Sequence, residues 1–209
     1  MSDARREWEE RARRDGASLR GVLFRGLPAA LNDALHEWHR SLVESQWLPH
    51  VAHGARVLDV GCGYGRLAAP AKAVRPDLDW TGQDLSQTYC TAFRAAVGAA
   101  VRGTLERLPF ADASFAGAIA VTSLMYATAG QRPAAFAELA RVLAPGAALL
   151  LVDPGEELRR LLARIGFARP GATGGEGFVE GEVERRAADA GFATIATGGN
   201  ASFTRALPL

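Results

Sequence analysis

The chain is poor in cysteine, carries no large excess of either charge and contains no long apolar run. Its 209 residues include two cysteines, Cys62 and Cys90, too few for a disulfide framework. The formal net charge is +1, so overall charge predicts no attraction to nucleic acid or to a membrane surface. No apolar run approaches the roughly 20 residues that span a bilayer, and the charged N-terminus lacks the apolar core of a signal peptide. These absences predict a cytoplasmic protein with neither a nucleic-acid nor a membrane partner.

Apolar patterning divides the chain into two parts. Residues 1–54 have the pattern of helices, a charged one over 4–14 and a second that begins near Pro28, a residue suited to a first helical turn. Apolar residues at helical spacing predict the packed face of the second helix: Leu31, Leu35, Trp38 and Leu42. Residues 55–209 alternate short apolar strands with helices, which is typical of a parallel sheet covered on both faces.

We therefore expect an α/β fold, a doubly wound, mostly parallel, seven-stranded sheet of the Rossmann-like kind. Residues 1–54 would form an N-terminal helical cap and residues 55–209 the ligand-binding domain. Strands are expected at 56–60, 78–83, 99–102, 117–122, 147–153, 192–197 and 202–207. Helices are expected between them at 65–74, 87–97, 132–143 and 181–190. The segment 155–181 is expected to be a short helix followed by a glycine-rich loop.

The most informative segment is VLDVGCGYGRLA at residues 57–68, where an apolar strand meets a glycine-rich turn and then a helix-compatible stretch. Such a turn is the usual place for an α/β sheet to hold a nucleotide-like ligand. Gly61 and Gly63 allow the backbone to approach the ligand closely. Asp59 would repel a pyrophosphate but attract an ammonium group, which S-adenosylmethionine carries. The G-x-G-x-G spacing also differs from the G-x-G-x-x-G of dinucleotide-binding proteins.

A second acid supports the same ligand. Asp84 ends the strand-like segment LDWTGQD at 78–84, roughly 20 residues after the glycine loop, the separation expected of an acid that binds ribose hydroxyls. Each acid also has a purely structural interpretation. Asp59 could cap the turn that follows it, and Asp84 could cap a helix that begins near Ser86.

With both acids in place, the chain resembles the class I S-adenosylmethionine-dependent methyltransferases over roughly residues 56–209. Three further segments fit that family's pattern, LPFADASF at 108–115, ELARVLAPG at 138–146 and AGF at 190–192. The resemblance implies S-adenosylmethionine as cofactor, a small-molecule acceptor, and residues 55–209 as the cofactor-binding methyltransferase domain. It leaves open the oligomeric state and whether the acceptor atom is oxygen, nitrogen or carbon.

The resemblance also implies a set of cofactor contacts. Asp59 would face the methionine ammonium, Asp84 the ribose and Leu85 the adenine. The expected cofactor-binding residues are Asp59, Gly61, Cys62, Gly63, Asp84, Leu85, Thr104, Leu105, Glu106 and Val121. The adenine end departs from the family pattern, because Thr104 and Ala116 stand where aspartates are common.

Candidate catalytic residues are fewer, because the protein's part in methyl transfer is to bind, orient and exclude water. Ser123, Met125 and Tyr126 follow the fourth expected strand and are substrate-side candidates, of which Tyr126 could orient or deprotonate an acceptor. His39, on the second helix, could act as a base. The alternatives are a half-buried tyrosine with a hydrated hydroxyl and a solvated histidine. His36 and His39 have a spacing that could serve a metal, but no third ligand cluster accompanies them, so no metal site is expected.

Two other functions remain open from the residues alone. One is an NAD-dependent oxidoreductase with an atypical loop, against which Asp59 and the glycine spacing argue. The other is a non-catalytic binding protein on the same fold. The N-terminal helices and the segment 155–181 have no role in the expected core, and we expect both to close over the substrate.

Overall fold

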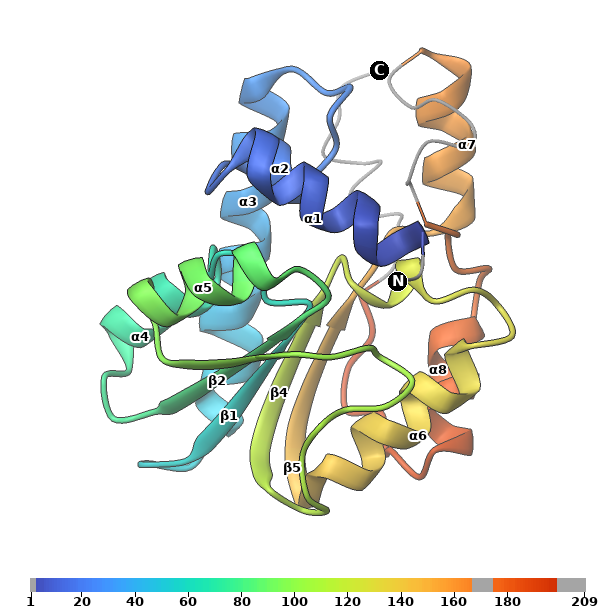
Figure 1. Cartoon of the computed structure of the whole chain (residues 1–209). Helices are drawn as coiled ribbons and strands as arrows, with labels where there is room; N and C mark the ends of the chain where they lie inside the picture. The colour runs from blue at the N-terminus through green and yellow to red at the C-terminus, as the bar shows by residue number, and fades with distance from the viewer. Residues whose placement is uncertain (1–2, 167–174, 199–209) are drawn as a thin grey trace.

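A five-stranded parallel sheet lies at the centre of the computed structural model, which describes residues 3–166 and 175–198 (Figure 1). The strands are β1 (Arg56–Val60), β2 (Asp79–Asp84), β3 (Ala99–Arg102), β4 (Phe115–Val121) and β5 (Leu143–Val152). Their order is β3-β2-β1-β4-β5, and each neighbouring pair is parallel. The strand order reverses between β1 and β4, and open α/β sheets bind ligands beyond the carboxyl ends of the strands at such a point.

Helices cover both faces of the sheet, as Figure 1 shows. One face carries α4 (Ala68–Val74), α5 (Gln87–Ala96) and the π-helical turn η1 (Val43–Trp47), which is followed by the short turn η2 (Leu48–His50). The other face carries α6 (Arg132–Val142) and α8 (Glu182–Asp189). Trp47, Trp80 and Phe93 are central to the first core, and Phe115 and Phe136 belong to the second. β4 is buried on both faces and its sequence FAGAIAV has no polar side chain, whereas β1 includes the acid Asp59 among its four buried residues.

Local sequence explains where several helices begin. The Ser86 hydroxyl caps α5 by accepting a hydrogen bond from the Tyr89 amide, and Ser18 caps the four-residue α2 (Leu19–Val22) in the same way. Pro28 immediately precedes α3 (Ala29–Leu42), and Pro133 lies in the first turn of α6. The positions of these helices therefore follow from side chains that the sequence displays directly.

The second predicted helix is present as α3, but its predicted packed face is wrong at two positions. Leu31 and Trp38 are 37% and 38% exposed. The buried residues of α3 are Asn32, Leu35 and His39, two of which are polar. The Asn32 amide donates to a backbone carbonyl before the helix, and His39 meets a guanidinium described below. Apolar spacing does not identify this face, because much of it packs through hydrogen bonds.

Five of the seven predicted strands are confirmed, with shifted ends, and so are the four helices predicted between strands. The strand predicted over 192–197 is wrong: these residues form no strand, and Ile195 is 84% exposed and so does not join the core. The strand predicted over 202–207 lies outside the described residues. The described sheet therefore has five strands rather than seven. None of the helices in the described ranges is both long and apolar enough to cross a membrane.

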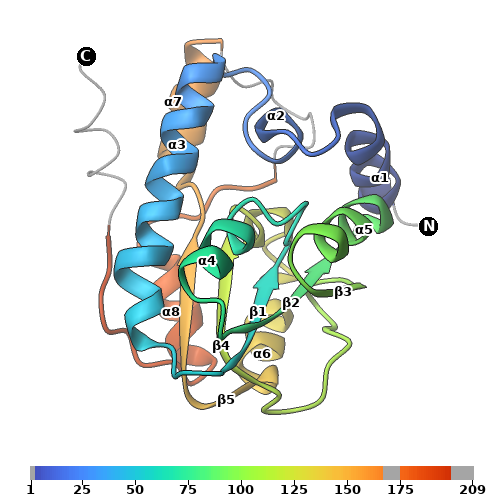
Figure 2. The same ribbon diagram turned by 90° about the vertical axis from the view of Figure 1, so that its left-hand side faces the viewer.

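Three helices lie at the carboxyl ends of the strands: α1 (Asp3–Asp15), α2 and α7 (Glu156–Arg164) (Figure 1). Helix α1 runs beside α5 (Figure 2), and the Glu9 carboxylate accepts hydrogen bonds from the Ser86 and Thr88 hydroxyls at 2.8 and 2.6 Å. The Tyr89 hydroxyl donates to the carbonyl of Gly21 at 2.9 Å. These bonds attach the N-terminal helices to the start of α5, next to the edge of the sheet.

A buried ion pair attaches the segment that follows α7 to helix α6. Nη1 of Arg132 lies 2.9 Å from each carboxylate oxygen of Glu182, and the guanidinium stacks over the Phe178 ring at 3.9 Å. Nη2 of Arg132 also donates to the Glu176 carbonyl at 2.7 Å. Removing one partner of such a pair costs about 3–5 kcal/mol, because the other charge stays buried. The pair therefore fixes residues 176–182 against the body of the domain.

Candidate functional site

A cavity of about 70 Å³ lies at the carboxyl ends of β1, β2 and β4. The glycine loop and the ends of β2 and β4 form its floor, and the N-terminal helices and the turn η3 (Leu124–Tyr126) close it. Its lining consists of Trp8, Val22, Gly61, Cys62, Gly63, Arg66, Gln83, Asp84, Leu85, Tyr89, Leu105, Val121, Thr122, Ser123 and Tyr126. Eight of these residues are among the twelve site residues expected from the sequence: Gly61, Cys62, Gly63, Asp84, Leu85, Leu105, Val121 and Tyr126.

The glycine loop has the backbone that its sequence predicts. Gly61 and Gly63 have φ values of +70° and +53°, which side chains with a Cβ rarely adopt. A Cβ on Gly61 would lie 2.6 Å from the Cβ of Ser123, and one on Gly63 would lie 3.0 Å from Cγ1 of Val22. Glycine is therefore required at Gly61 both by conformation and by the close approach of the β4 end.

Asp84 connects the two loops that border the cavity. One carboxylate oxygen accepts the Gly63 amide at 2.9 Å, and the other accepts the Ser86 amide at 2.8 Å. Burial raises the pKa of Asp84 to about 6 against the opposing effect of these amides. The cap of α5 is Ser86 rather than Asp84, so the capping interpretation of Asp84 is wrong. Asp84 instead braces the two loops, and its side chain also lines the cavity.

Asp59 is buried within β1 and is not among the residues that line the cavity. Burial raises its pKa to about 7, and the nearby charge of Arg66 acts in the opposite direction. Arg66 follows the glycine loop and does line the cavity. Burial lowers the pKa of Arg66 to about 10, so its guanidinium still carries a charge at neutral pH. The site therefore combines two acids whose ionisation is costly with one buried cation.

His39 lies behind Arg66 rather than on the cavity wall. Its Nδ1 is 3.2 Å from Nη2 of Arg66, and its side chain is 2% exposed. Burial, and then the charge of Arg66, hold the pKa of His39 well below its usual range. Because a guanidinium only donates, Nδ1 accepts and the ring proton is on Nε2. The structure thus shows neither the solvated histidine nor a histidine facing the cavity that the sequence suggested.

Tyr126 lines the cavity from η3 and meets the N-terminal helices there. Its ring packs edge-on against Trp8, with ring centres 4.8 Å apart. The Asp153 carboxylate holds the turn by accepting the Leu124 and Met125 amides, each at 3.2 Å. Burial raises the pKa of Tyr126, so the hydroxyl keeps its proton at neutral pH and can act as a donor.

The expected adenine-side residues divide into two groups. Leu85, Leu105 and Val121 line the cavity and give it an apolar wall. Thr104 and Glu106 are half-buried and do not line it, and Thr104 forms a β-bridge with Arg107 instead. In the described structure this end of the cavity is therefore defined by apolar contact rather than by the acceptor groups that the sequence suggested.

Ser123 lines the cavity as a substrate-side candidate should, and six further lining residues were not expected to touch a ligand, namely Trp8, Val22, Arg66, Gln83, Tyr89 and Thr122. The sequence could have indicated two of them as lining residues, because Arg66 directly follows the glycine motif and Gln83 directly precedes Asp84 at the end of β2. No feature of the sequence indicates Trp8 or Val22. They reach the cavity only because the N-terminal helices fold back over the sheet.

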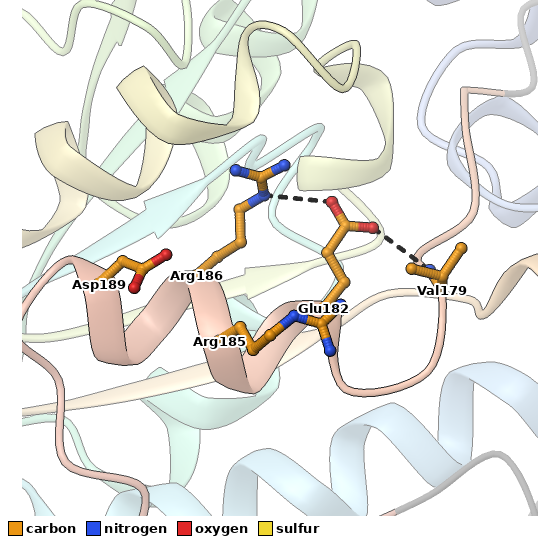
Figure 3. A pocket seen from close by; sticks show the side chains of 5 residues that line it. All are labelled: Val179, Glu182, Arg185, Arg186 and Asp189. Carbon is orange, nitrogen blue, oxygen red and sulfur yellow. Dashed lines mark hydrogen bonds and ion pairs between the residues drawn. The ribbon is translucent and has the colours of Figure 1, made fainter.

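A second hollow, of about 380 Å³, lies along α8 and is separate from the sheet edge (Figure 3). Its central carboxylate is that of Glu182, which accepts hydrogen bonds from Nε of Arg186 at 3.1 Å and from the Val179 amide at 3.3 Å. The same carboxylate holds Arg132 on its inner side. The groups of this hollow are thus used to hold α8 in place, and the candidate site is the smaller cavity at the sheet edge.

Comparisons with known proteins agree with this placement. Residues 57–146, which contain the glycine loop, Asp84 and β4, match a family model described as a methyltransferase domain. The O-methyltransferase resE of Aspergillus sclerotiorum is 32% identical over 148 residues, covering 54% of this chain and 55% of that protein. A fatty-acid O-methyltransferase of Mycolicibacterium smegmatis is 33% identical over 134 residues, 61% of this chain and 47% of that protein. The chain spans about half the length of the curated relatives it matches.

Solved structures agree as well. An S-adenosylmethionine-dependent methyltransferase from Thermotoga maritima superposes with a TM-score of 0.59 at 25% identity, over 77% of this chain and 74% of that one. The sheet order and the glycine loop thus define a Rossmann-like methyltransferase fold. Residues 57–146 match a methyltransferase domain, and together with the fold the comparisons support a class I S-adenosylmethionine-dependent methyltransferase. That family uses S-adenosylmethionine, which removes the NAD-dependent alternative.

Proposed function

We propose that this chain transfers a methyl group from S-adenosylmethionine to an oxygen atom of a small-molecule acceptor. The observation that carries the proposal is the cavity where Asp84 and the glycine loop face Tyr126 across the reversal point of the sheet. Two of the relatives described above are named O-methyltransferases, one of them a fatty-acid O-methyltransferase, and this supports oxygen as the acceptor atom.

The residues around the cavity fit the cofactor, although the space does not yet accommodate it. Asp84 offers a carboxylate for ribose hydroxyls, the positive-φ glycines offer close backbone approach, and Leu85 and Leu105 offer apolar contact for a base. However, about 70 Å³ is far below the roughly 300–1,000 Å³ of a small-molecule site. We therefore propose that residues 1–54 form a cap that opens, because Trp8 and Val22 supply the part of the wall that can move away.

When bound, S-adenosylmethionine would supply an electrophilic methyl group to an acceptor oxygen that is already ionised, so that S-adenosylhomocysteine leaves and no proton has to be removed. The chain's own residues hold and shield the reaction. We assign Tyr126 to the acceptor, as a hydrogen-bond donor that orients its oxygen, because burial keeps the phenol protonated. Trp8 packs against Tyr126 and would exclude water from it. His39 is assigned no proton transfer, since its Nδ1 is engaged by Arg66.

The proposal is tested by incubating the protein with S-adenosylmethionine and a panel of carboxylic acids, phenols, alcohols and amines, with S-adenosylhomocysteine measured as product. We expect turnover with an oxygen acceptor and none with the amines. Tyr126→Phe should lower kcat by roughly 10- to 100-fold while S-adenosylhomocysteine binds unchanged. Turnover confined to amines would contradict oxygen transfer. Cofactor binding without turnover on the whole panel would instead favour the non-catalytic alternative.

We also propose a cytoplasmic location, supported by the state of the two cysteines. Cys62 and Cys90 are both free and buried, as expected for a protein kept in a reducing compartment. Fractionation of the native host with an antibody to the protein tests this, and recovery from an extracellular or membrane fraction would contradict it.

A further inference from the structure

Three buried polar atoms around the cavity have no hydrogen-bond partner. They are Nη1 of Arg66, Oγ of Ser123 and Oε1 of Gln83. The three residues are 9%, 5% and 1% exposed, and each of them lines the cavity. Buried polar atoms in folded proteins are almost always paired, and an unpaired one costs about 1–3 kcal/mol. A set of unpaired atoms on one cavity therefore points to a polar ligand that completes them.

Arg66 is held in place without being neutralised. Nη2 lies 3.2 Å from Nδ1 of His39 and 3.5 Å from Oγ1 of Thr122, both of which are uncharged partners. Arg66 takes part in none of the ion pairs found among the described residues. His39 accepts through a neutral ring, so the guanidinium keeps its charge, with the buried Asp59 as the nearby acid, and Nη1 has no hydrogen-bond partner. A carboxylate in the place of His39 would have cancelled that charge.

The backbone of Thr122, whose hydroxyl contacts Arg66, is strained, and this strain fixes the position of Ser123. Thr122 ends β4 with a φ of +56°, which is unfavourable for a β-branched residue and persists only where the surroundings enforce it. The turn places Ser123 directly against Gly61, where a Cβ would lie 2.6 Å from Cβ of Ser123. Thr122 thus brings the Ser123 hydroxyl and the Arg66 guanidinium to the same end of the cavity.

The donors at this end match a carboxylate. Arg66 is the one basic side chain among the described lining residues, and a guanidinium N–H together with a hydroxyl can donate to the two oxygens of one carboxylate. Asp84 is the one acidic side chain among the described lining residues, and it offers only acceptors when ionised. The described lining therefore holds one acidic acceptor and, separately, donors that suit a carboxylate.

We infer that Arg66 and Ser123 form a carboxylate-binding subsite in this cavity, with His39 as the residue that positions Arg66. Two molecules could bring that carboxylate. One is the amino-acid end of the cofactor, and the other is a carboxylic-acid acceptor, in which case the inference rests on the proposed O-methyl transfer.

The first arm of the test measures the cofactor's carboxylate by isothermal titration. Wild type, Arg66→Gln and Ser123→Ala are each titrated with S-adenosylhomocysteine and with its analogue that lacks only the carboxylate. If the cofactor supplies the group, wild type should prefer S-adenosylhomocysteine at least about tenfold, and Arg66→Gln should lose that preference. Arg94→Gln, an exposed arginine on α5, is the matched control and should behave as wild type.

The second arm measures an acceptor carboxylate with the complex already loaded with S-adenosylhomocysteine. Octanoate is the probe and octanol is its uncharged counterpart. If the acceptor supplies the group, octanoate should bind wild type and not Arg66→Gln, while both proteins bind S-adenosylhomocysteine alike. If Arg66→Gln changes neither preference, the subsite is overturned. If the carboxylate preferences are as expected but the protein methylates no oxygen acceptor, only the proposed acceptor chemistry is contradicted.

The role of His39 is tested by a conservative pair. His39→Gln keeps an oxygen that can accept from Arg66, whereas His39→Phe fills a similar space without an acceptor. We expect the carboxylate preference to survive in His39→Gln and to fall at least about fivefold in His39→Phe. His53→Phe, at a histidine whose side chain is 89% exposed, is the control. Equal preferences in the two His39 variants would show that His39 only fills space.

Discussion

Asp84 holds together both loops beside the cavity, and we propose that it also faces the ligand. Its two oxygens accept from Gly63 and Ser86, and the ribose hydroxyls would share those same oxygens. Asp84→Ala should weaken S-adenosylhomocysteine binding at least tenfold, or by about 2–4 kcal/mol, since a charged acceptor is lost from buried donors. Titration calorimetry measures this, with circular dichroism to check folding. Asp84→Asn keeps one acceptor and should fall between. An unchanged affinity in Asp84→Ala would leave the residue with its bracing role alone.

Asp59 and Asp84 should make cofactor binding depend on pH. Burial raises their pKa values to about 7 and about 6, so both hold protons at mildly acidic pH. A positively charged cofactor favours the ionised forms, and binding should therefore release protons and weaken as the pH falls from about 8 to about 5.5. Titrations in two buffers of different ionisation enthalpy count the protons released. Zero proton release across this range would contradict the shifts.

The same shifts act on stability with the opposite sign. In the unfolded chain both groups lose their protons near pH 4, whereas the folded chain keeps them until about pH 6 to 7. The folded state thus binds more protons between these limits, and the free energy of unfolding of the cofactor-free protein should fall across that interval as the pH rises. Over the same pH interval, ionisation of the two acids thus strengthens cofactor binding and lowers the free energy of unfolding of the cofactor-free protein.

At the scale of elements, α1 is attached to the ligand-binding edge mainly through Glu9. Its carboxylate accepts from the Ser86 and Thr88 hydroxyls. Burial acts to raise the pKa of Glu9, but these hydrogen bonds outweigh it and lower the pKa to about 2. Glu9→Ala should therefore loosen α1 and speed hydrogen exchange over residues 3–15. The exposed Glu10 is the matched control, and Glu10→Ala should leave exchange unchanged. Equal exchange in both variants would show that Glu9 does not hold the helix.

How far the sequence predicts this structure differs from element to element. The strand–loop segment at 56–63 and Asp84 were predictable, because β-branched runs, glycines and an acid at fixed spacing determine local backbone directly. The packed face of α3 was not, since Asn32 and His39 pack through partners far along the chain. The strand over 192–197 failed for a related reason. Its alternating pattern suited a strand, but strand formation also requires a neighbouring strand to pair with.

For the whole molecule, we expect the closed cavity to limit the rate at which ligand can arrive. The free space of about 70 Å³ must widen before a nucleoside enters, and α1 and α2 cover it. Association of S-adenosylhomocysteine should then be limited by opening, with an observed rate that levels off as ligand concentration rises. Stopped-flow tryptophan fluorescence follows this through Trp8. Glu9→Ala should raise the plateau. A rate that stays linear in ligand at all concentrations would mean that no opening step precedes binding.

The alkylation rate of the buried Cys62 thiol should report how often the N-terminal helices open. Cys62 lies in the cavity lining, beneath the N-terminal helices, while Cys90 is buried away from it. Burial raises the pKa of the Cys62 thiol well above its usual range, so alkylation is slow until solvent reaches it. Each opening of the helices would expose Cys62 briefly, and a small maleimide would then alkylate it. The alkylated fraction of the peptide that contains Cys62 would therefore increase with the number of openings. Mass spectrometry would compare the alkylated fraction of Cys62 with that of Cys90. The ratio would thus measure the lifetime of the closed molecule without a reporter group attached beforehand.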